Sequence, residues 1–355
     1  RAVRRRNSPF AFPVYTTKSG RPPRGIAFDA GLKRTRPQCY TRENLGATLI
    51  PYGRDTMKIT VYQVDAFTTE LFSGNPAGVV PNADGMTDRQ MQQLARELNN
   101  SETAFIFDRQ EDGADIEVRF FTPTREVPIC GHATISAHYV YAKEHGLTDC
   151  VIRQKTKAGV LPVEIAERDG DLFVTMTQAG IVFGVMIRDE RLARLLEGLG
   201  LAEDDLEEKL PVQIVSTGHS KVMVPIRSKD RLDALVPDAG ILSALSREID
   251  CNGYYVFTFD SREEGVLTSG RMFAPAIGIA EDPVTGNANG PLGAYLTFYG
   301  KLPPREEGFA FTIKQGEAIG RKGYMQVIVR SFGGDPVIVK VGGRARIVFM
   351  TEIGL

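Results

Sequence analysis

Two short glycine-led segments give the first indication of chemistry in this chain. They read CGHAT at residues 130–134 and TGNAN at residues 285–289, and each has the form of a helix start. The first N–H groups of a helix have no acceptor within the helix, and the helix dipole adds a partial positive charge, so such a start attracts anions. If both starts face one cleft, the N–H groups at Gly131 and Gly286 can hold a carboxylate from two sides.

No motif for a cofactor or a metal accompanies these segments. The sequence has no GxGxxG after a predicted strand, no Walker loop, no HExxH and no cluster of residues at metal-ligand spacing. We therefore expect no cofactor and no metal. The chemistry that this leaves is acid–base catalysis at a C–H bond activated by a neighbouring carboxylate or double bond.

The elements that must position the two segments alternate between strand and helix patterns from Met57 onward. Apolar periodicity predicts a helix over 87–99, with Thr87 as its N-cap, and a second helix, rich in small residues, over 132–145. Strands are predicted at 59–64, 103–107 and 116–121, and three short strands joined by Ala-Gly and Asp-Gly turns at 151–176. This pattern indicates an α+β fold.

An internal repeat divides this region into two similar halves. SGNPAGVVP at 73–81 resembles TGHSKVMVP at 217–225, and RFFTP at 119–123 resembles RMFAP at 271–275. Each RxFxP segment precedes one of the two glycine-led helix starts. The repeat predicts halves near 57–175 and 176–355, with a cleft between them.

Composition excludes several classes of protein. The 355 residues are 42% hydrophobic and 25% charged, which is typical of a globular protein, and no apolar run is long enough to cross a membrane. The region after residue 56 is acidic overall, which argues against a nucleic-acid partner. Four scattered cysteines without a CxxC pair indicate no disulfide scaffold and favour a reducing, cytoplasmic location.

The first 56 residues differ from the rest. They carry 12 Lys and Arg against 3 Asp and Glu and show neither helical nor alternating periodicity. We expect a poorly ordered basic leader with few core contacts, which is an extension, an artefact or an organelle transit segment. No apolar stretch follows the basic residues, so a secretory signal is not predicted.

Five ordered segments resemble the PhzF-like isomerase family, and in particular its YddE-type branch. They are SGNPAGVV, NNSETAF, FFTPTREVPICGHAT, FAPAIGIAEDPVTGNANGPLGAYL and QGEAIGR, and they extend from near Met57 towards the C-terminus. The resemblance implies the diaminopimelate-epimerase-like fold. In that fold, two similar α+β halves each curl a mostly antiparallel sheet around a central helix, the active site lies between them, and the extreme C-terminus can pack on the first half.

The resemblance also implies which residues are catalytic. Glu102, in the Ser-Glu-Thr motif, matches the residue that moves a proton in the family's best-known member, on a dihydro-hydroxyanthranilate. His132 and Asp282 match the other polar site residues: His132 would hydrogen-bond the substrate, and Asp282 would orient it or share a proton with Glu102. Gly131 and Gly286 would contribute N–H donors, and Asn287 stands where many relatives have serine. Structural alternatives are a strand cap for Glu102, a helix cap for His132 and a turn residue for Asp282.

Cys130 relates the chain to the epimerases of the same superfamily. Those enzymes use two cysteines, one at each helix start, but the second start here has Thr285 and no thiol. A thiol at a helix N-terminus is expected to have a lowered pKa and to be reactive. The competing interpretation is that Cys130 is a small buried residue beneath the cleft. His219, which follows the second repeat's Thr-Gly, receives no role.

Three functions are therefore considered. The first is a cofactor-independent isomerase that moves a proton on a small carboxylate-bearing metabolite through Glu102. The second is an amino-acid epimerase or racemase that uses Cys130 with Glu102 or Asp282, and the third is a non-catalytic small-molecule binder. The expected partners are the metabolite and a second copy in a homodimer, with no nucleic acid and no membrane.

Overall fold

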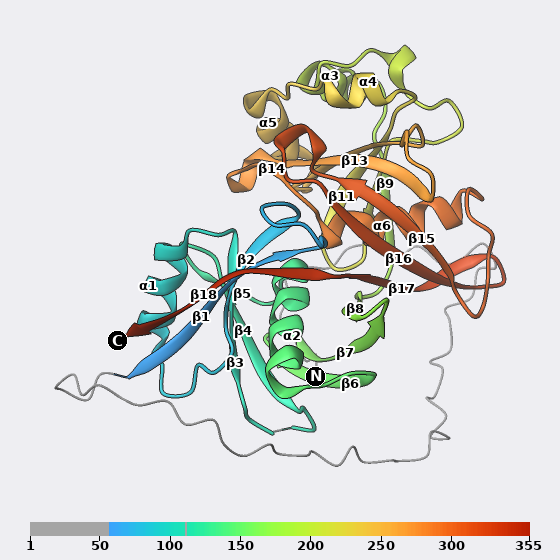
Figure 1. Cartoon of the computed structure of the whole chain (residues 1–355). Coiled ribbons are helices and arrows are strands. Elements are labelled where there is room, and N and C mark those ends of the chain that lie inside the picture. The colour runs from blue at the N-terminus through green and yellow to red at the C-terminus, as the bar shows by residue number, and fades with distance from the viewer. Residues whose placement is uncertain (1–56, 111) are drawn as a thin grey trace, which may run out of the picture. The chain divides into compact units, whose positions relative to one another are not determined.

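Two successive sets of strands, each wrapped around one buried helix, make up the described chain (Figure 1). The computed structural model describes residues 57–110 and 112–355, and Lys58–Leu355 form one compact unit. The predicted basic leader, 1–56, lies outside the described residues. None of the described helices is long and apolar enough to span a membrane.

The first set surrounds helix α2. Its strands are short, as the alternating pattern predicts, and helix α1 begins with a capping box in which Thr87 and Gln90 bond reciprocally. The elements are β1 (Lys58–Ala66), β2 (Asn75–Val80), α1 (Asp88–Leu98), β3 (Glu102–Phe107), β4 (Ile116–Phe121), β5 (Glu126–Val127), α2 (Gly131–His145), β6 (Cys150–Thr156), β7 (Gly159–Arg168), β8 (Asp171–Thr177) and β9 (Val182–Met186).

The second set surrounds helix α6 and adds three further helices. Helix α3 precedes β10, and α4 and α5 lie between β11 and β12, where the first set has α1 between β2 and β3. The elements are α3 (Asp189–Leu199), β10 (Gln213–Ser216), β11 (Ser220–Pro225), α4 (Lys229–Asp233), α5 (Ala239–Ile249), β12 (Tyr254–Thr258), β13 (Val266–Ala274), β14 (Ile279–Asp282), α6 (Gly286–Phe298), β15 (Phe309–Gln315), β16 (Gly323–Phe332), β17 (Asp335–Gly343) and β18 (Ala345–Gly354).

Strand pairing repeats in the same order in both sets. In the first, β2 pairs parallel with β3, β3 antiparallel with β4, and β4 parallel with β6. In the second, β11 pairs parallel with β12, β12 antiparallel with β13, and β13 parallel with β15. The α+β class and the two similar halves that the sequence predicts are confirmed.

An ion pair is repeated along with the topology. Arg119 on β4 bonds Glu126 through two nitrogens, and Arg271 on β13 bonds Glu281 in the same way. Each arginine belongs to the RxF segment that the repeat identifies. A bidentate pair fixes the relative orientation of its two side chains. In the first half it joins β4 to β5, and in the second half it joins β13 to β14, just before the buried helix.

The two halves exchange strands at their boundary. The last strand, β18, pairs antiparallel with β1 along its whole length, from Lys58 opposite Gly354 to Ala66 opposite Ala345. In turn, β9 pairs with β10. Strand β8 pairs with β17 (Figure 1). The boundary that the repeat predicts, between residues 175 and 176, falls inside β8.

Helices α2 and α6 are buried on nearly every side because strands surround them. Small residues make this possible: a methyl group on Gly293 of α6 would lie 2.7 Å from Val327 Cγ1 and 2.8 Å from Val329 Cγ2. This packing places the N-termini of the two helices inside the protein.

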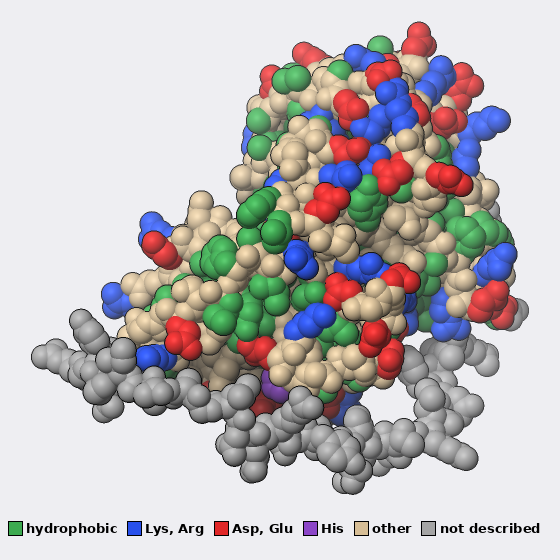
Figure 2. All heavy atoms as spheres, in the orientation of Figure 1, with side chains coloured by type: hydrophobic (Ala, Val, Ile, Leu, Met, Phe, Trp, Pro, Cys, Tyr) green, Lys and Arg blue, Asp and Glu red, His purple; other side chains and the backbone are tan. Residues whose placement is uncertain are grey.

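Acidic and basic side chains are intermixed over the visible face of the described chain (Figure 2).

Candidate active site

The N-termini of α2 and α6 meet at Gly131 and Gly286. A methyl group on Gly131 would lie 3.9 Å from the Cα atom of Gly286, so the two helix starts lie within about one side-chain carbon of van der Waals contact. Within the described chain, the first intrahelical amides with a backbone acceptor are those of Thr134 in α2 and Ala288 in α6. The preceding amides, at Gly131, His132, Gly286 and Asn287, are free of helical partners. The structure brings together the two glycine-led segments that the sequence singles out.

Neither N-cap residue blocks these amides. Cys130 and Thr285 both have extended backbones, with φ of −143° and −115°, and neither side chain caps its own helix. The Thr285 hydroxyl instead donates to the carboxylate of Asp282, and the Thr285 amide donates to Gln315 Oε1 at 3.1 Å. Both helix starts therefore keep their donors available for a ligand.

Glu102 lies beside this junction at the first position of β3. Its Oε2 is 3.4 Å from Nε2 of His132, and its side chain keeps 18% of its surface exposed while His132 keeps 8%. Glu102 is the more accessible of the two. The pair brings a carboxylate on a strand and an imidazole on the first turn of α2 together, and both are groups that act in general acid–base catalysis.

His132 has a partner on each ring nitrogen. Ser101 Oγ lies 3.1 Å from Nε2, and Cys130 Sγ lies 3.4 Å from Nδ1. A neutral thiol can donate its S–H to Nδ1, which leaves the ring proton on Nε2, facing Glu102 and Ser101. Ser101 is a site residue that the sequence analysis did not name, although it precedes Glu102 in the Ser-Glu-Thr motif.

Cys130 is buried at the start of α2, which favours the interpretation of a small buried residue over that of a reactive thiol. Its helix-start position favours a thiolate, but burial and then the nearby charge of Glu102 hold the pKa of the Cys130 thiol well above its ordinary value. Desolvation is the largest of these influences because the residue is only 7% exposed. Cys130 is therefore a neutral hydrogen-bond partner of His132.

Asp282 lies at the end of β14, and two other residues bond its carboxylate. Asn75 donates to Oδ1 at 3.0 Å, and the Thr285 hydroxyl donates to Oδ2. The pKa of Asp282 is raised, mainly by burial and further by the charge of Glu102. His132 and the hydrogen bonds from Thr285 and Asn75 lower the pKa, but by less. Asp282 is therefore close enough to Glu102 and His132 for their charges to affect its pKa.

Asn75 and Gln315 are further site residues that the sequence analysis did not assign. Asn75 also donates to the Val284 carbonyl at 2.8 Å, and Gln315 donates to the Asp282 carbonyl at 2.8 Å. Both lie in segments that carry the family resemblance, SGNPAGVV and QGEAIGR, so the resemblance could have identified them as site residues. Together they fix the loop between β14 and α6. Asn287 is half-buried at the start of α6, and His219 is exposed.

Three of these residues could also approach a metal ion. One ligand atom each from Glu102, Cys130 and His132 lies within 4.8 Å of the other two. A thiol must lose its proton to bind a metal, and the surroundings of Cys130 favour its neutral form.

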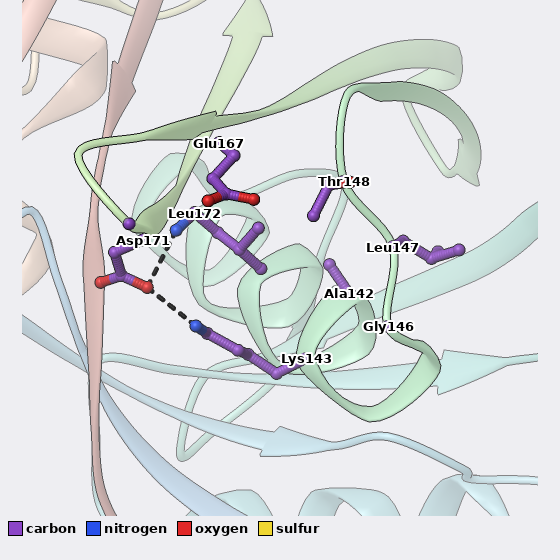
Figure 3. A pocket seen from close by; sticks show the side chains of 9 residues that line it. Ala142, Lys143, Gly146, Leu147, Thr148, Glu167, Asp171 and Leu172 are labelled. Carbon is purple, nitrogen blue, oxygen red and sulfur yellow. Dashed lines mark hydrogen bonds and ion pairs between the residues drawn. The ribbon is translucent and has the colours of Figure 1, made fainter.

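A surface pocket lies at the other end of α2 (Figure 3). Residues of α2, the following turn and β8 line it, and the Lys143 ammonium lies 2.9 Å from Asp171 Oδ1. The 15 residues of α2 separate this pocket from Gly131 by about 20 Å. It is therefore distinct from the site at the helix starts.

Comparison with known proteins gives consistent matches. The family model for PhzC-PhzF, phenazine biosynthesis-like protein, matches residues 64–351. The uncharacterised isomerase YddE of Escherichia coli K12 is 47% identical over 298 residues, 83% of this chain and 98% of its own. The trans-2,3-dihydro-3-hydroxyanthranilate isomerase of Pseudomonas fluorescens is 33% identical over 267 residues, 74% of this chain and 87% of its own. A PhzF-family crystal structure from Bacillus anthracis superposes with a TM-score of 0.76 at 32% identity, covering 84% of this chain and 99% of that one.

Proposed function

This chain belongs to the phenazine biosynthesis-like (PhzF) family of isomerases, and from that premise we propose that it moves a proton on a small carboxylate-bearing substrate. The observation that carries the proposal is the meeting of two helix N-termini beside the Glu102–His132 pair. The helix starts supply donors for an anion, and the pair supplies a proton acceptor next to it.

Glu102 is the proposed base and acid. Its carboxylate removes a proton from a C–H bond of the substrate, becomes a carboxylic acid, and returns that proton to another carbon of the same substrate. The C–H electrons form a new double bond to the adjacent carbon, and the electrons of the original double bond form the new C–H bond with the returned proton, so atoms and charge balance without an external oxidant or reductant. Negative charge that develops on the substrate faces the free amides of Gly131, His132 and Gly286.

His132 and Asp282 have supporting roles in this proposal. The Nε2–H of His132 points towards Glu102 and a substrate oxygen, and Asn75 and Thr285 hold Asp282 in place. Asp282 in its protonated form, which burial favours, avoids repulsion with the substrate anion. Cys130 keeps the proton of His132 on Nε2 and performs no proton transfer itself.

The epimerase alternative is less well supported. A two-base thiol mechanism needs a reactive cysteine at each helix start, whereas this site has one neutral thiol and a threonine bonded to Asp282. The same features leave the isomerase proposal unaffected because it needs neither thiol.

The test uses trans-2,3-dihydro-3-hydroxyanthranilate, the compound named for the Pseudomonas relative, together with a panel of small unsaturated carboxylates in D₂O. We expect the wild type to make a product isomer, which carries deuterium to the extent that the partly exposed acid form of Glu102 exchanges with solvent before it returns the proton. Glu102→Gln, which is nearly isosteric, should fold and bind but turn over about 10²–10⁴-fold more slowly. Equal rates in the two proteins would remove Glu102 from the mechanism, and inversion at an α-carbon would select the epimerase.

A further inference from the structure

Lys221 is a buried lysine for which the described chain provides no counter-ion. It is 8% exposed, and its ammonium donates to the Ser220 carbonyl at 3.1 Å without an ion pair to any described carboxylate. The Cys251 thiol is electrostatically coupled to it, but burial raises the pKa of that thiol to about 11, so it is neutral near pH 7. A buried charge without a partner is costly, and proteins keep few of them without a function.

The other two buried lysines show the contrast. Lys314 Nζ lies 3.0 Å from Glu263 and 3.1 Å from Glu317. Lys229 Nζ lies within ion-pair distance of Asp233 and 3.2 Å from Glu317. This chain therefore neutralises the buried lysines that serve its structure, and Lys221 is the exception among those described.

The internal repeat relates Lys221 to the position of Glu102. In the first half, Ala77 of β2 lies opposite Glu102 at the start of β3. The equivalent positions in the second half are Lys221 of β11 and Gly253, whose carbonyl accepts from the Val222 amide. A methyl group on Gly253 would lie 2.4 Å from Lys221 Cδ. The lysine stem therefore occupies the space that a side chain equivalent to Glu102 would fill.

Lys221 also lies on the sheet face that carries Asp282. Strand register places Met223, Tyr255, Met272 and Asp282 side by side across β11, β12, β13 and β14. Side chains alternate along a strand, so Lys221, two residues before Met223, shares this face, which α6 covers. The charge of Asp282 acts on Lys221 in the direction that favours the ammonium, although burial opposes it more strongly.

We propose that Lys221 is a specificity-determining residue whose ammonium binds the carboxylate of the substrate. The inference rests on the proposed function and deepens it: Glu102 of the first half acts as the base, and Lys221 of the second half, whose stem fills the space beside Gly253 at the position equivalent to Glu102, acts as the counter-ion. The substrate class is then a small carboxylic acid in its ionised form, and a neutral amide or ester is rejected because it leaves the buried ammonium unpaired.

Binding to three probes tests this proposal. Titration calorimetry with anthranilate, citrate and the neutral anthranilamide should show that wild type prefers at least one acid over the amide. Lys221→Met, of similar length and without charge, should bind that acid about tenfold more weakly or worse and lose the preference, whereas Lys221→Arg should keep it. Equal binding by Lys221→Met, or no binding of either acid by wild type, would overturn the proposal.

Stability separates a ligand-binding role from a structural one. Lys221→Met should leave the melting temperature unchanged or raise it, because the mutation removes an unpaired buried charge. Lys314→Met, which strands two carboxylates, should lower it. A lowered melting temperature for Lys221→Met as well would indicate a structural lysine. If Glu102→Gln proves fully active while Lys221→Met loses acid binding, the proton-transfer proposal fails and the Lys221 proposal stands.

Discussion

At the scale of residues, His132 organises the site. Its two ring nitrogens face different elements, with Cys130 on the segment that enters α2 and Glu102 and Ser101 at the start of β3. One imidazole thus links the helix start that would bind an anion to the carboxylate that would move a proton. Burial decides which form each neighbour takes: it keeps Cys130 neutral and favours the protonated form of Asp282.

The raised pKa of Asp282 gives a prediction for pH dependence. An unfolded aspartate titrates near about 3.9. Between that value and the higher folded value, the folded chain binds more protons than the unfolded chain, so the contribution of Asp282 to stability falls as pH rises. Asp282→Asn cannot ionise, so its melting temperature relative to wild type should increase from pH 4 towards neutrality.

Thermal unfolding of both proteins across pH 4–8 measures this difference. The absolute offset includes the altered hydrogen bonds to Asn75 and Thr285, so the trend with pH is the informative quantity. Asp204→Asn, at an exposed position, serves as the control and should show no trend. A difference for Asp282→Asn that is constant or declines with pH would contradict the assignment.

At the scale of elements, α2 and α6 determine the site through their N-termini. Both helices are rich in small and apolar residues along their buried turns, where strands pack against them, and each begins with a glycine. A methyl group on Gly131 would meet Gly286 Cα and Met176 Sδ at 3.9 Å, which is ordinary contact. The glycine is therefore unnecessary for folding, and its absent side chain leaves space for a ligand.

Gly131→Ala should separate folding from activity. We expect a melting temperature close to that of wild type, and a fall in turnover on the order of 10²-fold because the methyl group displaces the substrate from the free amides. Gly293→Ala provides the contrast, since its methyl group would overlap Val327 and Val329 and should cost about 1–3 kcal/mol in stability. Full activity in Gly131→Ala would show that the ligand does not bind between the helix starts.

At the scale of the whole described unit, the exchange of strands ties the halves together. β18 follows the second half but pairs with β1 of the first, and β8 pairs with β17. A site made from both halves needs this connection, because Glu102 and His132 come from one half and Asp282 from the other. The exchange holds the two helix starts in register.

Deletion of residues 345–355 tests the contribution of this strand. It removes the ladder to β1, and with hydrogen bonds worth about 0.5–1.5 kcal/mol each we expect a loss of at least about 2 kcal/mol in unfolding free energy. Urea denaturation measures the loss. A shorter deletion, of residues 353–355, leaves most of the register pairs and should cost much less; equal stability of the wild type and the longer deletion would show that β18 is dispensable.

The sequence by itself determined most of the local structure and the candidate residues. Apolar periodicity and capping residues predicted α1 with its Thr87 cap, and turn residues predicted β6, β7 and β8, because these signals act between neighbours in the chain. The repeat predicted two similar halves, since duplicated segments fold alike. The motifs named Glu102, His132 and Asp282.

Features that form where distant segments of the chain meet were determined only by the tertiary structure. The proximity of Gly131 to Gly286, the bond from Asn75 to Asp282 and the pairing of β18 with β1 join residues more than 150 positions apart, which no local pattern encodes. Burial likewise favoured one of the two interpretations of Cys130, because desolvation of the thiol, which raises its pKa, depends on everything packed around it. Lys221 acquired its significance in the same way: a lysine in a sequence is ordinary, and only the folded core shows that this one has no counter-ion among the described residues.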